Sequence, residues 1–250
     1  MPDVPFLAPL PPTYAATRAA LQRVAVHVLA RRRDALVGKL GLRAVPGGIA
    51  TPAAGPDHEV VRTSGSWLLC ERTGAASRAV ALDLRTASLA EAAAAVDVDL
   101  DRDFSAGRDT PGVGDASAPL GVDEAAADAL AAWYALGWRA LDRVACALGE
   151  RGSPSVVQLW PEHFDAGCDV GVGGDRRANL GASPGDAFHA SPYLYVGPWG
   201  DERPGDPAYW NAPFGAVLGY DALRVTADPP AAAVAFLREG LERLAPDHTG

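Results

Sequence analysis

The sequence predicts an α+β protein built mostly from antiparallel β-sheet, with flanking helices in a two-layer arrangement. Segments with a helical spacing of apolar residues stand near the beginning, middle and end of the chain, and segments of alternating apolar and polar residues lie between them. Helices and strands do not alternate strictly, as they would in a parallel doubly wound protein. Short Gly- and Pro-bearing turns separate successive strands, which favours antiparallel pairing.

The first predicted helix follows a proline-rich arm at residues 2–12, and Thr13 is its expected N-cap. Apolar residues recur along this helix at spacings of three and four, so one side should face a core. The residues of this stripe are Tyr14, Thr17, Leu21, Val24 and Val28.

A meander of strands should follow the first helix. Residues from Leu36 to Ala44 alternate between two faces, which predicts a strand with one wet side. Further strands are predicted at Ser66–Glu71 and Ala79–Leu84, with turns such as Pro46-Gly47-Gly48 between strands.

The middle of the chain combines two capped helices with a long loop. Ser88 and Glu91 have the spacing of a capping box ahead of an alanine-rich helix. Residues 97–122 are acidic, rich in Gly and Pro, and without periodicity, which predicts a loop. Asp123 should cap the main core helix.

The C-terminal third should form a second meander and a last helix that begins at Asp228, with Pro229 in its first turn. Strands are predicted at Ser155–Trp160, Gly167–Val172, Arg176–Ala182 and Tyr193–Gly197. We expect one domain over residues 1–250. Its parts are the first helix and meander at 13–96, the acidic loop at 97–122, the core helix at 123–149, and the second meander with the last helix at 155–245.

Composition excludes several classes of function. The formal net charge of −9 argues against a surface that binds nucleic acid. No apolar run approaches the ~20 residues that a membrane span needs. The N-terminus has no basic segment and is interrupted by prolines, so we expect no signal peptide. The three cysteines are far apart in the sequence, which fits a reducing compartment and a cytoplasmic protein: Cys70, Cys146 and Cys168.

Polar and aromatic residues concentrate between Gln158 and Asn211. In each predicted strand of this segment they share one face, opposite apolar residues. If the strands pair, this mixed surface could line a pocket for a small polar or aromatic ligand, and a sheet face exposed to solvent is the alternative. The candidate ligand-binding residues are Gln158, Trp160, Asp169, Asn179, Tyr193, Tyr195, Trp210 and Asn211.

Two other functions are open. His163, Asp165 and His189 have the composition of a two-histidine, one-carboxylate set for iron or another divalent metal such as zinc, with Asp186 as a partner of a ligand. Hydrogen-bonding roles for both histidines are the alternative. A third function is a protein-interaction module, since exposed aromatic residues often anchor interfaces. Its candidate anchors are Trp160, Trp199, Tyr209 and Trp210.

One serine motif fails its chemical requirements. Gly181-Ala-Ser183-Pro-Gly185 matches the nucleophile elbow of α/β-hydrolases. The residue after the serine must donate its backbone N–H to the oxyanion hole, and here that residue is proline, which has none. The sequence therefore predicts a turn at this motif rather than an esterase site.

Four segments of the chain resemble a family of uncharacterised bacterial proteins that is classed as a domain of unknown function. The resemblance is strongest from about residue 155 to 245 and extends more loosely to the first helix. It implies a single soluble domain and no particular activity, substrate or catalytic residue. The segments are Leu159–Asp165, Asn179–Asp186, Pro192–Trp199 and Trp210–Ala212.

Overall fold

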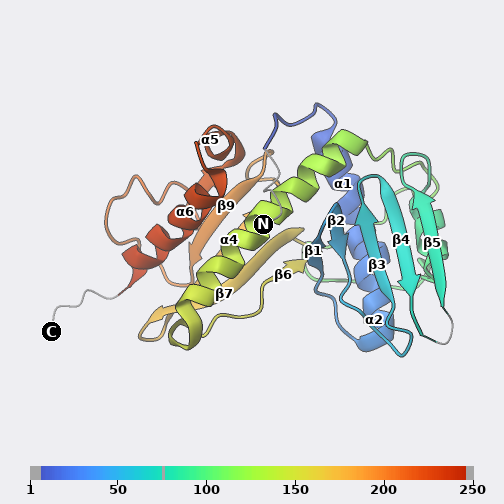
Figure 1. The fold of residues 1–250 in the computed structure, drawn as a ribbon, viewed down its shortest axis with the longest axis horizontal. Coiled ribbons are helices and arrows are strands. Elements are labelled where there is room, and N and C mark those ends of the chain that lie inside the picture. Colours follow the sequence, from blue (N-terminus) through green and yellow to red (C-terminus); the bar gives the residue numbers. More distant parts are fainter. Residues whose placement is uncertain (1–6, 75–76, 246–250) are drawn as a thin grey trace. The chain divides into compact units, whose positions relative to one another are not determined.

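The computed structural model describes residues 7–74 and 77–245, and it confirms the α+β fold with two antiparallel five-stranded sheets (Figure 1). The chain divides into two compact units. The described part of the C-terminal unit comprises residues 7–8, 133–158 and 165–245, and that of the N-terminal unit comprises residues 9–74, 77–132 and 159–164. This division leaves the single domain over residues 1–250 a prediction.

The N-terminal unit is a meander sheet with helices. Its strands follow one another in the order β1-β2-β3-β4-β5, and each pairs antiparallel with the next. Side chains at alternate positions of β3 and β4 are buried, as the alternating pattern requires. The strands are β1 (Arg43–Val45), β2 (Gly48–Ala50), β3 (Val60–Ser64), β4 (Trp67–Arg72) and β5 (Arg78–Asp83), and the helices are α1 (Tyr14–Val24), the π-helix η1 (Ala25–Ala30), α2 (Arg31–Val37) and α3 (Leu89–Ala95).

Several local predictions for this unit hold. All five residues of the predicted apolar stripe of the first helix are buried. Ser88 and Glu91 form the capping box at the start of α3. Pro46 and Gly47 form the turn between β1 and β2. Thr13 occupies the predicted N-cap position of α1, although its side chain makes no capping hydrogen bond.

The strand predicted from Leu36 to Ala44 is largely wrong. Leu36 and Val37 belong to α2, and Gly38 ends that helix in the left-handed region with φ of 64°. The strand begins only at Arg43. The alternation of Leu and Gly in this segment therefore marks a helix end followed by a connection. The sequence also did not predict β2 or β3.

Three side chains of α1, η1 and α2 hold the acidic loop. Arg23, His27 and Arg31 are spaced four residues apart and bind backbone carbonyls of the loop. Arg23 donates to the carbonyl of Val113 at 3.0 Å, and His27 Nε2 lies 2.7 Å from the carbonyl oxygen of Pro111. The loop contains no helix or strand, as predicted, but its backbone is tied to the helical segment.

His27 makes this attachment sensitive to pH. Because a carbonyl only accepts, Nε2 carries the proton, while the buried Nδ1 has no hydrogen-bond partner among the described residues. Burial lowers the pKa of His27, and the nearby charges of Arg31 and Arg23 lower it further.

We predict that the free energy of unfolding falls as the pH decreases below about 6.5, the ordinary pKa of histidine. The folded state disfavours the charged ring, so the unfolded state binds more protons there. His27→Gln keeps an amide donor for Pro111 and should reduce this acid dependence in denaturant titrations at several pH values. An unchanged pH dependence in His27→Gln would contradict the role of His27.

The C-terminal unit contains the second sheet, in the order β10-β9-β8-β7-β6. α4 begins in the N-terminal unit after its cap, Asp123, and continues into the C-terminal unit. Its Gly137 packs against Ala182 of β8. The elements are α4 (Glu124–Gly152), β6 (Gln158–Trp160), β7 (Asp165–Gly173), β8 (Arg176–Ser183), β9 (Tyr193–Pro198), β10 (Ala216–Gly219), α5 (Tyr220–Arg224) and α6 (Pro229–Leu244).

The sequence predicted most of this unit. The predicted strands overlap β6 to β9, and the Asp228 side chain caps α6, where it accepts from Ala231 N–H at 2.9 Å. β10 and α5 were not predicted. In the part of the chain that the structure describes, no helix has the length and apolar character of a membrane span.

Candidate functional site

The sheet of the C-terminal unit has one apolar face and one polar, aromatic face. Leu180 and Ala182 are fully buried on the side where α4 packs. Strand register places the alternate residues together on the opposite face, because neighbouring side chains of a strand point to opposite sides. Asp169 pairs with Asn179, Gly181 with Tyr195, and Ser183 with Tyr193. We call this opposite side the polar face.

Glycines form the floor beneath Tyr195. A Cβ atom at Gly181 would lie 2.1 Å from Cζ of Tyr195, and one at Gly167 would lie 3.4 Å from its hydroxyl. The phenol ring therefore lies against Gly181, where a side chain would displace it, and its hydroxyl lies close to Gly167. Its hydroxyl donates to Asp165 at the start of β7.

Both tyrosines of the polar face remain protonated donors. Burial raises the pKa of Tyr195 well above its ordinary value, and the charge of Asp165 raises it further. Burial and the hydrogen bond to Asp186 likewise raise the pKa of Tyr193, whose hydroxyl lies 2.6 Å from Asp186 Oδ2. Each phenol is paired with a carboxylate, so these groups hold the face in shape.

Two phenylalanines extend the aromatic part of the polar face. Phe188 and Phe214 contact each other edge to face, with ring centroids 5.1 Å apart. Each also contacts Tyr193, and Phe214 contacts Tyr195. Their exposed fractions are 46% and 37%. The sequence reasoning missed both residues, because they lie in the connections rather than in predicted strands.

Trp199 lies at the other end of the polar face. Its indole is 62% exposed, although two contacts fix its position. The indole N–H donates to Asn179 Oδ1 at 2.9 Å, and the guanidinium carbon of Arg177 lies 5.6 Å from the ring centroid. Arg177 is itself paired with Asp169.

Gly197 separates Trp199 from the tyrosine end of the face. A Cβ atom there would have the Phe214 carbonyl oxygen at 3.7 Å as its nearest neighbour, so the position is open. Gly197 pairs with Asn179 across the strands. Two glycines in the sequence could have indicated a close contact on this face. Gly167 lies two residues from Asp169 and Gly181 two residues from Asn179, so each glycine shares the face of the polar residue.

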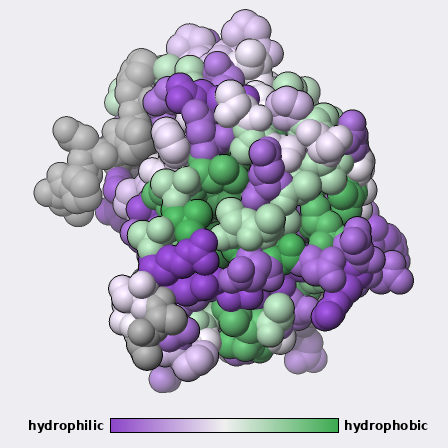
Figure 2. All heavy atoms as spheres, turned by 90° about the vertical axis from the view of Figure 1, so that its right-hand side faces the viewer, coloured by the Kyte–Doolittle hydropathy of each residue, from purple (hydrophilic) through white to green (hydrophobic). Residues whose placement is uncertain are grey.

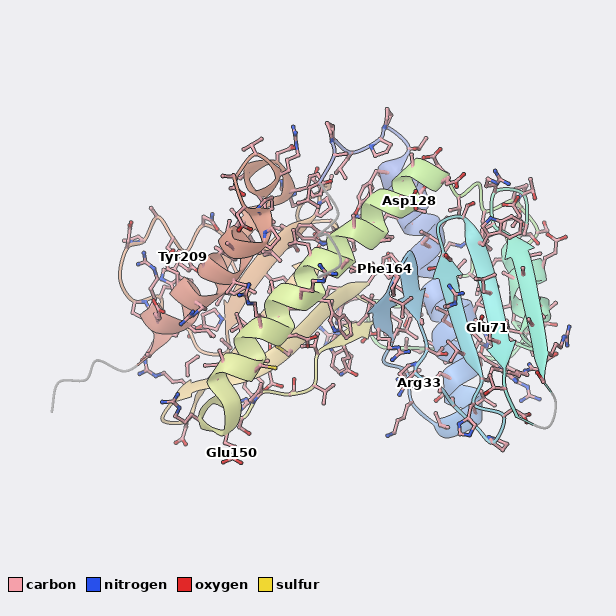
Figure 3. All side chains as sticks on the ribbon, viewed as in Figure 1. Arg33, Glu71, Asp128, Glu150, Phe164 and Tyr209 are labelled. Carbon is pink, nitrogen blue, oxygen red and sulfur yellow. The ribbon has the colours of Figure 1, made fainter. Side chains whose placement is uncertain are left out.

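Trp210 and Asn211 take part in the local structure of the unit. The indole of Trp210 donates to the carbonyl of Pro204 at 2.9 Å. The amide of Asn211 accepts from Val217 N–H at 2.8 Å and donates to its carbonyl at 3.1 Å, so it occupies the edge of β10. Tyr209 lies beside α6, where its hydroxyl donates to the carbonyl of Phe236 at 2.8 Å (Figure 3).

Gln158 and Trp160 occupy the two ends of β6. Gln158 is half-buried and belongs to the C-terminal unit. Trp160 belongs to the N-terminal unit, and its side chain is 43% exposed. Of the predicted ligand-binding residues, register brings Asp169, Asn179, Tyr193 and Tyr195 onto one face.

The three predicted metal ligands each have another partner. His163 Nδ1 lies 3.3 Å from Asp109 Oδ2 in the N-terminal unit. In the C-terminal unit, Asp165 accepts from Tyr195, and His189 Nδ1 donates to the carbonyl of Ser191 at 2.8 Å. Across residues 7–74 and 77–245, no group of three His, Cys, Asp or Glu side chains is arranged to hold a metal ion. The metal site stays a prediction.

Asp186 acts as a turn residue. Its Oδ1 accepts from the backbone N–H groups of Phe188 and His189, at 2.8 and 3.1 Å, while Oδ2 accepts from Tyr193. Both carboxylate oxygens thus fix the connection between β8 and β9. This connection supports the aromatic end of the polar face.

Comparison of the chain with models of protein families, with curated proteins and with solved structures finds no match. The resemblance of its C-terminal segments to an uncharacterised bacterial family remains a prediction.

Proposed function

We propose that the C-terminal unit binds a small ligand with a flat ring on its polar face, above Gly197 and against Trp199. The observation that carries this proposal is the fixed yet exposed indole of Trp199. An exposed aromatic side chain contributes little burial free energy to folding. Because the indole is already held in place, it loses little conformational entropy when a ligand stacks on it. Gly197, where a Cβ atom would meet no other atom closer than 3.7 Å, leaves space beside it.

The charges of the site argue against an anionic ligand. Arg177 is paired with Asp169, and each tyrosine hydroxyl is paired with a carboxylate. The two phenols are neutral and leave the negative charges of Asp165 and Asp186 in place, so an anionic ligand would be repelled. Because the Oδ1 atom of Asn179 accepts from Trp199, its amide nitrogen is oriented outward as a donor. The fitting ligand has a neutral ring with a hydrogen-bond acceptor at its edge, as in nucleosides and neutral sugars.

We place this activity in the cytoplasm. The three cysteines are free thiols in the structure, although Cys70 and Cys168 are buried and only Cys146 is exposed. Unpaired thiols are typical of reducing compartments. The acidic composition supports a small-molecule ligand over nucleic acid.

A ligand screen tests the proposal. Nucleosides, nucleobases, neutral sugars and aromatic amides would be screened by thermal shift, and binding would be measured by calorimetry. Stacking on an aromatic ring contributes about 1–3 kcal/mol. Trp199→Ala should therefore weaken binding by between about fivefold and about 150-fold.

Trp67→Ala is the matched control, because Trp67 is 41% exposed but belongs to β4 of the N-terminal unit. This variant should bind as the wild type does. The proposal fails if no compound of these classes binds, or if Trp199→Ala binds a hit with unchanged affinity.

A further inference from the structure

The outer strands of the two sheets differ in how their edges are protected. β1 and β6 have three residues each, and Asn211 occupies the edge of β10 through its two hydrogen bonds to Val217. β5 is the exception. It has six residues, contains neither Lys nor Pro, and carries charge only at its two ends. Edge strands without such protection tend to pair with a further strand.

The backbone groups on the open edge of β5 can be assigned. Leu84 N–H donates to the carbonyl of Ser66 at 2.8 Å, one position beyond the first pair between β4 and β5. Hydrogen-bonded and non-bonded pairs alternate along an antiparallel ladder. Val80 and Leu82 therefore bond to β4, whereas the N–H and C=O groups of Ala79 and Ala81 point away from it. No described residue accepts from or donates to these four groups.

The open edge is complementary to itself. If two copies of β5 pair antiparallel about a twofold axis at Val80, Ala79 of each copy faces Ala81 of the other. These two residues exchange hydrogen bonds in both pairs, so all four open groups of each strand are satisfied. Arg78 then faces Leu82, and no like charges are opposed. If the register shifted by one residue, Ala79 and Ala81 would face residues whose N–H and C=O groups already bond to β4, and no hydrogen bonds would form between the copies.

Apolar side chains also lie at the surface beside β5. Ala79 and Ala81 are exposed, and Val80 and Leu82 are half-buried. Ala90 and Ala94 of α3, which packs beside β5, are exposed as well. Figure 2 faces the side on which β5 lies in Figure 1 and shows hydrophobic side chains at the surface among hydrophilic ones.

We infer that β5 is the interface of a homodimer, in which the sheets of two N-terminal units join edge to edge through Ala79 and Ala81. The occupant of the edge is a second copy of this chain, because the open groups and the charges match under twofold symmetry. The joined sheet would have ten strands. This inference is independent of the ligand proposed for the C-terminal unit.

Ala81→Pro tests the interface. Proline removes the outward N–H of this position and leaves the bonds to β4 intact, so the chain should still fold. We expect the full-length wild type to have twice the chain mass in sedimentation or light scattering, and Ala81→Pro to have the mass of one chain. Ala81→Ser keeps the N–H and should remain a dimer. Circular dichroism and melting curves verify that each variant is folded.

Hydrogen exchange on the wild type gives a test that does not depend on a variant. The amide protons of Ala79 and Ala81 should exchange slowly in the dimer and faster after dilution, whereas those of Val80 and Leu82 should be protected at both concentrations. A monomeric wild type, a folded Ala81→Pro dimer, or unprotected Ala79 and Ala81 amides in a dimer would each overturn the inference.

Discussion

Glu59→Gln is expected to reduce the free energy of unfolding by about 3 kcal/mol, because it removes the shared anion of a buried ion-pair network. Glu59 is 3% exposed and binds two guanidinium groups. Arg32 Nε lies 2.7 Å from Oε1, and Arg72 Nε lies 2.5 Å from Oε2. Asp97 accepts from Arg72 at 2.7 Å and closes the network at its exposed side. Glutamine would leave two half-buried cations with one exposed carboxylate.

The same network predicts an acid transition. Burial by itself would raise the pKa of Glu59, but the hydrogen bonds and charges of Arg32 and Arg72 outweigh burial and lower it below the ordinary 4.5. The stabilisation is therefore fully present above about pH 4.5 and is lost as the pH falls through the lower pKa of the folded state. Denaturant titrations should show the difference between wild type and Glu59→Gln shrinking below that pH.

Glu239→Gln is the control for this prediction. Glu239 pairs with Arg243 on the surface of α6, at 2.7 Å and with 49% of its side chain exposed. Exposed pairs contribute about 0–1 kcal/mol, so this variant should be nearly as stable as the wild type. If the two substitutions lowered the free energy of unfolding equally, burial of Glu59 would not strengthen its ion pairs, and the prediction would be wrong.

The fold class followed from the sequence because it depends on periodicity, which is local. The strands β7, β8 and β9 were recognised since one face of each is apolar over several residues. The short strands β1, β2 and β10, with three or four residues each, carry few alternations, and the equally short β6 was recognised only within the longer segment predicted at Ser155–Trp160. Gly38 shows the limit most clearly, since its left-handed conformation ends a helix where the pattern of Leu and Gly suggested a strand.

The candidate site was predictable only where it follows strand parity. Asn179, Tyr193 and Tyr195 were placed on one face before the register was known. The long-range contacts were not accessible to the same reasoning. Nothing local indicates that Trp199 donates to Asn179, or that the Arg31, Arg32 and Arg33 run divides its roles among a loop carbonyl, a buried carboxylate and the Gly41 carbonyl.

Gly137→Ala is expected to destabilise the C-terminal unit by about 2 kcal/mol, although alanine is intrinsically the better helix former. Alanine in a helix interior is favoured over glycine by about 1 kcal/mol. At Gly137, however, a Cβ atom would lie 2.4 Å from the Cβ of Ala182 on β8. Real contacts of this kind are far longer, so α4 would have to move away from the sheet, and overpacking of a core typically costs about 1–3 kcal/mol.

A compensating change separates this clash from any other effect of the substitution. Ala182→Gly removes the opposing methyl group, so Gly137→Ala with Ala182→Gly should recover most of the lost stability in denaturant titrations. Gly200→Ala, at a position where a Cβ atom meets nothing within 4 Å, should change stability little. Because α4 covers the face of β8 opposite Asn179, a double variant no more stable than Gly137→Ala would contradict the close packing on which the sheet rests.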